Sequence, residues 1–97
     1  MEKVKSALAI ILFGSVIKKE KKAKDIDALV VIDKTGFENA KKEIGDINYF
    51  NDKKIHPIYQ TRKDLQKHVN EGNKVILNAL KGIVVTGEDV IIESLQK

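Results

Sequence analysis

Short apolar runs separated by polar stretches indicate several β-strands. Residues 6–13 form a continuous run rich in β-forming side chains, short enough to be a strand covered on both faces. Residues 25–33 begin with acidic side chains and continue into the β-branched and apolar content of a central strand. Two further strands are predicted, one at 54–61, where Pro57 favours an edge, an end or a bulge, and one at 83–85.

Apolar positions three and four residues apart predict an amphipathic helix over 37–47. These positions are Phe37, Ala40, Ile44 and Ile47. A second helix is predicted over 61–69, whose first and fourth residues have the spacing of a capping box, and a third over 72–80. The last apolar segment, 90–95, fits either a strand or a helix.

These elements predict a small α/β fold of the α+β type, in which a mixed sheet of three to five strands carries helices mainly on one face. The 97 residues suffice for one core but not for two, so 1–97 is interpreted as a single domain. A thin core of this kind suits a homodimer.

Composition and charge narrow the class of ligand. The absence of cysteine excludes disulfides and thiolate metal sites, and no segment has transmembrane length, so a soluble cytoplasmic protein is expected. The net charge of +4 suits polyanions such as triphosphates or RNA. Five lysines within 18–24 form either a solvated loop or a phosphate or RNA contact.

Two acidic residues at the start of the second strand indicate a cation site. Residues two apart in a strand share a face, so Asp25 and Asp27 bring two carboxylates within roughly 6–7 Å of each other. Such a pair is unfavourable unless it is solvated at a strand end or bridged by a cation. Mg²⁺ is the natural occupant, since it takes carboxylate, phosphate and water oxygens, and no His or Cys set favours zinc.

A glycine and a serine end the first strand. Glycine allows backbone amides to approach an anion closely, and the hydroxyl of Ser15 and a following helix N-terminus supply further donors. Taken alone, Gly14-Ser15 is an ordinary turn. Combined with Asp25 and Asp27, it fits a Mg²⁺-bound triphosphate.

Together these residues resemble the minimal nucleotidyltransferases of the DNA polymerase β superfamily. The motif of that family appears here as Phe13-Gly14-Ser15, a spacer of nine residues, and Asp25-Ile26-Asp27. The resemblance implies that the two aspartates hold two Mg²⁺ ions, or Mn²⁺, while Gly14, Ser15 and Lys18 bind the triphosphate, ATP being the expected donor. The implied reaction is nucleotidyl transfer to a hydroxyl on a protein, an RNA or a small molecule.

The third carboxylate of the family is replaced in this chain. Where the next strand would carry it, the sequence has His56, which is either a metal neighbour or base, and so a catalytic candidate with Asp25 and Asp27, or a structural residue. Asp52 just before that strand is a second candidate. Asp33 is excluded because it lies six residues beyond Asp27, about 20 Å away at strand rise.

Three functions therefore remain open. The first is an active nucleotidyltransferase, which the resemblance places as the antitoxin half of a pair with a helical HEPN-type partner. The second is a catalytically impaired module that binds nucleotide or protein. The third is a basic RNA-binding domain that uses the lysine loop.

The aromatic residues Tyr49, Phe50 and Tyr59 are interpreted as core and rim rather than as base-stacking platforms.

Overall fold

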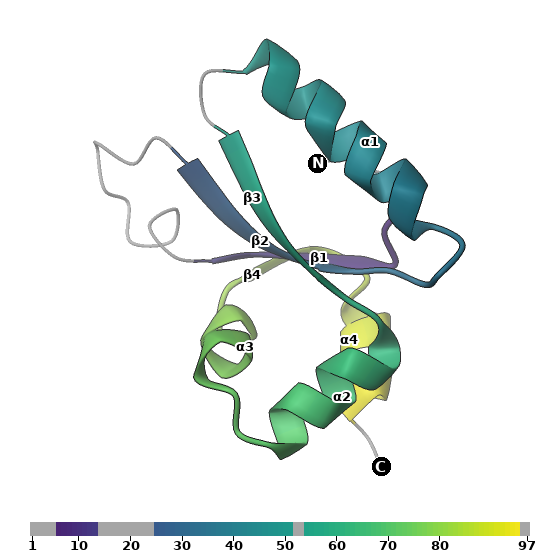
Figure 1. Ribbon diagram of the computed structural model, residues 1–97. Coiled ribbons are helices and arrows are strands. Elements are labelled where there is room, and N and C mark those ends of the chain that lie inside the picture. The colour runs from purple at the N-terminus through teal and green to yellow at the C-terminus, as the bar shows by residue number, and fades with distance from the viewer. Residues whose placement is uncertain (1–5, 14–24, 52–53, 96–97) are drawn as a thin grey trace.

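The computed structural model describes residues 6–13, 25–51 and 54–95. Four strands and four helices follow one another within these residues (Figure 1). In chain order they are β1 (Ala9–Phe13), β2 (Asp25–Val31), α1 (Phe37–Phe50), β3 (Lys54–Gln60), α2 (Arg62–Asn70), α3 (Lys74–Ala79), β4 (Ile83–Thr86) and α4 (Glu88–Leu95). The segment for which sequence left strand and helix open, 90–95, is helical.

The strands form one mixed sheet in the order β3-β2-β1-β4. β1 pairs antiparallel with β2 and with β4, whereas β2 and β3 run parallel. The parallel pair requires a crossover, and α1 provides it, running back along the sheet from the end of β2 to the start of β3 (Figure 1). The predicted mixed α/β sheet is confirmed.

Helices cover both faces of the sheet (Figure 1): α2, α3 and α4 pack on one face and α1 on the other. Successive residues of the two central strands alternate between two apolar clusters. Ile11 and Leu29 pack on the side of α2, α3 and α4, together with the fully buried Leu65 of α2. Ile10 and Val30 pack on the side of α1. The continuous apolar runs of β1 and β2 are explained by this burial on both faces.

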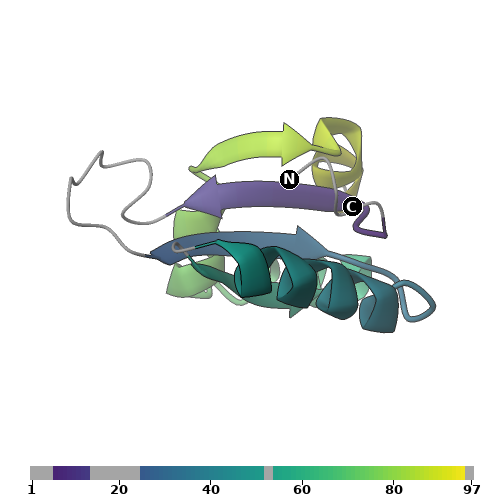
Figure 2. The ribbon, with the colours of Figure 1, turned by 90° about the horizontal axis from the view of Figure 1, so that it is seen from above.

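On the α1 face the cover is incomplete. Viewed from above, α1 lies along the β2 and β3 side of the sheet, and no described helix lies over β1 and β4 (Figure 2). Leu12 packs partly against the α1-side cluster, and its register partner Ile83 shares that face but is 55% exposed. Within the described residues, this part of the sheet face therefore has no helix over it.

Two glycines hold β4 tightly against β1. A Cβ atom on Gly82 would lie 2.1 Å from the carbonyl oxygen of Leu12, and one on Gly87 would lie 2.1 Å from that of Leu8. Gly87 also has a φ of 76°, a conformation that favours glycine. Both ends of this short strand thus depend on the absence of a side chain.

Local hydrogen bonds set the starts of α1 and α2. Before α1, the carboxylate of Asp33 accepts from the Thr35 hydroxyl at 2.8 Å and from the Gly36 amide at 2.7 Å. These bonds lower the pKa of Asp33. At α2, the Thr61 hydroxyl accepts from the Asp64 amide at 3.1 Å, and the Asp64 carboxylate accepts from the Thr61 amide at 3.3 Å. This reciprocal pair is the predicted capping box.

The interpretation of the aromatic residues was partly wrong. Tyr59 does pack in the core region, edge to face with Phe37 at 5.0 Å between ring centroids. Tyr49 and Phe50, however, are each 81% exposed, and their rings contact each other at 4.9 Å. The reason is that α1 runs to Phe50, beyond Ile47, the last of its residues that packs against the α1-side cluster.

Within the described residues, none of the helices combines the length and the apolar character needed to cross a membrane.

Candidate functional site

Asp27 lies near the start of β2, on the face that α2, α3 and α4 cover. Leu29 and Val31 of the same strand belong to the cluster under those helices, and residues two apart share a face. Asp27 is half-buried there. Asp25 is the first residue of β2, and strand geometry separates the two positions by roughly 6–7 Å. Both positions lie on this strand, and the role of the two aspartates as a pair stays a prediction.

His56 stands next to Asp27 on the neighbouring strand. Asp27 is the register partner of His56 in the parallel pairing with β3, and of Phe13 in the antiparallel pairing with β1. Adjacent strands are about 4.8 Å apart, so Phe13, Asp27 and His56 form one row across three strands. His56 is exposed. The end of β1, the start of β2 and the start of β3 thus meet at one end of the sheet, where α3 lies beneath (Figure 1).

The start of β3 is fixed by α1. The side chain of Asn48 donates to the Ile55 carbonyl at 3.0 Å and accepts from the Ile55 amide at 2.7 Å, as a neighbouring strand would. Lys54, the register partner of Asp25, donates through Nζ to the carbonyl oxygens of Asn48 and Asn51, at 2.6 Å for the latter. Its charge lies at the C-terminus of α1, where a cation is favoured.

Asn48 and Lys54 are residues that sequence reasoning missed. Asn48 holds the residue before His56, and Lys54, the register partner of Asp25, ties the start of β3 to the end of α1. Neither role has a signal in the linear pattern, because each depends on the register between β2 and β3 and on where α1 ends.

The donor set fits a hard cation. Asp25 and Asp27 offer carboxylate oxygens, which Mg²⁺ combines with substrate phosphates and waters. Among the residues that the structure describes, no three Asp, Glu or His side chains gather as a ligand set. Asp33 lies beyond the opposite end of β2, bound to its own turn, in agreement with its exclusion.

Four further predicted site residues lie outside the described part of the chain. They are Gly14, Ser15, Lys18 and Asp52. Their roles stay predictions that rest on the sequence motif and on the position of Phe13 at the end of β1.

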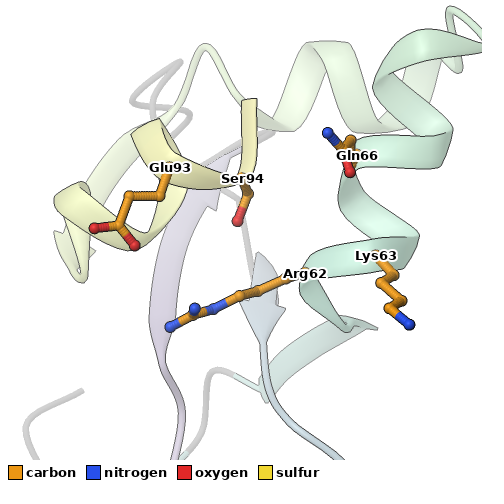
Figure 3. Close-up of a pocket in the computed structure, with 5 residues that line it drawn as sticks. All are labelled: Arg62, Lys63, Gln66, Glu93 and Ser94. Carbon is orange, nitrogen blue, oxygen red and sulfur yellow. The ribbon is translucent and has the colours of Figure 1, made fainter. Parts of the chain in front are cut away.

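Two hollows lined by described residues lie away from this end of the sheet. One, of about 460 Å³, is lined at the far ends of β2 and β3 by residues that include Asp33, Lys34 and Arg62. The other, of about 160 Å³, lies between α2 and α4 (Figure 3). There Arg62 extends from α2 toward α4, while Lys63 points away. Neither hollow contains a predicted site residue, so neither belongs to the candidate site.

Comparison with known proteins supports the assignment made from the motif. A family model described as a nucleotidyltransferase domain matches residues 2–85, which include Gly14, Ser15, Asp25, Asp27 and His56. No curated protein and no solved structure gives a significant match.

Proposed function

Because this chain belongs to the nucleotidyltransferase domain family, we propose that it transfers a nucleotidyl group from a nucleoside triphosphate, ATP in the first instance, to a hydroxyl acceptor. One observation carries the proposal. Asp25 and Asp27 begin the strand whose first residues lie beside the end of β1, immediately before Gly14 and Ser15. This is where a triphosphate and its metal ion would be bound together. The composition, free of cysteine, suits action in the cytoplasm.

The chain's own residues would bind and orient the substrate. Asp25 and Asp27 would hold Mg²⁺, or Mn²⁺, which when bound neutralises charge on the leaving pyrophosphate and lowers the pKa of the attacking hydroxyl. Gly14 and Ser15 would donate main-chain and hydroxyl hydrogen bonds to the phosphates, and Lys18 would add positive charge. The protein's contribution is therefore mainly positioning and electrostatics.

His56 would act on the acceptor side of the site. It stands in the row beside Asp27, and by the resemblance to the family it occupies the position of the third carboxylate. An imidazole there would accept the proton of an attacking hydroxyl. The same replacement supports a second candidate function, in which the domain binds nucleotide without turnover. Label transfer to an acceptor separates the two functions.

A helical partner protein of the HEPN type is proposed as the acceptor or as its carrier. Tyr49 and Phe50 form an exposed aromatic pair at the end of α1 that leads to the start of β3. Aromatic side chains of this kind are enriched in protein interfaces, and a partner seated on them would bring its hydroxyl to the Asp27 end of the sheet.

The test is calorimetric titration of ATP into the purified protein with and without Mg²⁺. Binding should require Mg²⁺ and should be lost in the double variant Asp25→Asn, Asp27→Asn. The matched control, Glu38→Gln with Asp46→Asn, removes two exposed carboxylates from α1 and should bind as the wild type does. The proposal would be refuted if the wild type did not bind ATP, or if the double variant bound ATP as tightly as the wild type.

A second experiment separates catalysis from binding. The protein is incubated with ATP labelled at the α-phosphate and with a co-purified helical partner, and label on the partner is measured. His56→Ala should keep ATP binding and lose most of the transfer if the imidazole accepts the proton. Retained binding without any transfer by the wild type would establish the impaired module instead.

A further inference from the structure

The two edges of the sheet differ in how they are protected. Exposed strand edges pair readily with other chains, and proteins block them with proline, charge or covering groups. On β3, Pro57 lacks an amide hydrogen, and the Asn48 side chain already satisfies both main-chain groups of Ile55. Lys54 adds a charge at its start. The β3 edge is thus closed to strand addition at several points.

β4, at the other edge, has no proline and no charge within it, although it is short and its pairing with β1 is irregular at Val85. Its sequence is Ile83-Val84-Val85-Thr86, without charge or proline, and all four residues are exposed, the three apolar ones by 55%, 38% and 40%. Among the described strands only β1 pairs with it, so its outer side offers main-chain donors and acceptors (Figure 2). Glycines at both ends fix it to β1, so the edge is a preformed template rather than a loose segment.

The charges that flank β4 select the partner strand. Lys81 lies just before the strand, Glu88 and Asp89 lie just after it, and all three are exposed. In an antiparallel pair of two β4 strands, the lysine end of each lies beside the acidic end of the other. A parallel pair would bring like charges together. The edge is therefore complementary to itself in one direction only.

We propose that β4 pairs antiparallel with β4 of a second copy of this chain, so that two four-stranded sheets join into one of eight strands. Two-fold symmetry about an axis perpendicular to the sheet relates the two strands. In this arrangement Lys81 of each copy lies toward the start of α4 of the other copy, which carries Glu88 and Asp89.

The helix that follows β4 also exposes apolar side chains. Stable interfaces bury about 1,200 Å² or more in total, which a four-residue strand pair does not supply by itself. α4 follows β4 after a single residue, and it leaves Ile92 and Leu95, three residues apart on one side of the helix, exposed. Burial of these side chains in the dimer would add apolar area to that of the strands.

The test is a charge-swap experiment read by sedimentation equilibrium at low ionic strength, where exposed charges are least screened. The wild type should be a dimer at micromolar concentration. Lys81→Glu should weaken self-association about tenfold or more, and so should the double variant Glu88→Lys, Asp89→Lys, because each brings like charges together at two symmetry-related contacts.

The decisive sample is an equimolar mixture of the two variants. In a mixed dimer each strand end again faces the opposite charge, so association should return to near the wild-type strength, and a mass tag on one variant identifies the mixed species. Recovery on mixing also shows that both variants are folded. The proposal would be overturned if the wild type were monomeric or if neither charge swap weakened the dimer. It would also be overturned if the mixture associated no more strongly than each variant alone.

Discussion

Replacing Gly87 by alanine should destabilise this protein far more than the same change at Gly72. Both glycines have positive φ, 76° and 72°, so a Cβ atom costs each about 1–2 kcal/mol of backbone strain. At Gly72 nothing lies within 4 Å of the added atom, and the strain is the whole cost. At Gly87 the atom would also lie 2.1 Å from the Leu8 carbonyl oxygen and 2.6 Å from Ala9 Cα.

That overlap involves main-chain atoms at the start of β1, which are held from the other side by β2. Relief therefore requires β4 or the turn into α4 to move away, and overpacking of this kind costs about 1–3 kcal/mol more. The expected loss in the free energy of unfolding is thus roughly 2–5 kcal/mol at Gly87. In a domain of this size the thermal midpoint falls by about 4–8 °C for each kcal/mol.

Urea unfolding of the three variants Gly87→Ala, Gly72→Ala and Gly45→Ala measures these differences. Gly45 lies in α1 with no atom within 4 Å of an added Cβ, so alanine there should stabilise the protein by about 0.5–1 kcal/mol through helix propensity. Equal losses at Gly87 and Gly72, with unchanged denaturant dependence, would refute the claim that β4 is packed against β1 at this glycine.

Two further perturbations test local features of the fold. Thr61→Ala removes the hydroxyl that accepts from the Asp64 amide and should cost about 1 kcal/mol in chemical unfolding, whereas Thr61→Ser should cost much less. Asp33 has a pKa below its usual value of 3.8 because Thr35 and Gly36 donate to its carboxylate. A depressed folded-state pKa contributes stability that is present above the unfolded value and lost as pH falls through the folded one. Asp33→Asn should therefore flatten the dependence of stability on pH below about pH 4, and an unchanged slope would contradict this role.

The sequence predicted the strands and the acidic pair because both depend on local pattern. β1 and β2 contain continuous apolar runs because each is buried on both faces of the sheet. The acidic pair is visible in the sequence because Asp25 and Asp27 are two residues apart at the start of β2. The segment 90–95 was ambiguous because its local pattern does not distinguish a strand from a helix. Residues 90–95, four of them apolar, fit either period, and in the structure they belong to α4, whose Ile91 packs under the sheet.

What the sequence did not show depends on register between distant segments. The facing of Asp27 and His56 follows from the parallel pairing of β2 with β3, which no residue pattern encodes. The support of Ile55 by Asn48 requires α1 to end above the start of β3. Tyr49 and Phe50 are exposed because α1 is longer than the helix predicted from the sequence and carries them past the sheet.

Pairing through β4 would leave the proposed nucleotide site of each copy open. β2 is separated from the proposed dimer axis by β1 and β4, so the β2 strands of the two copies would lie about 24 Å apart at a strand spacing of about 4.8 Å. An axis perpendicular to the sheet keeps both Asp27 residues on the same face but turns them toward opposite ends. Neither copy then supplies a residue to the other's site, so the charge-swap variants should change the state of association without changing Mg²⁺-dependent ATP binding per chain. A parallel loss of ATP binding in the monomeric variants would show that the two features are coupled.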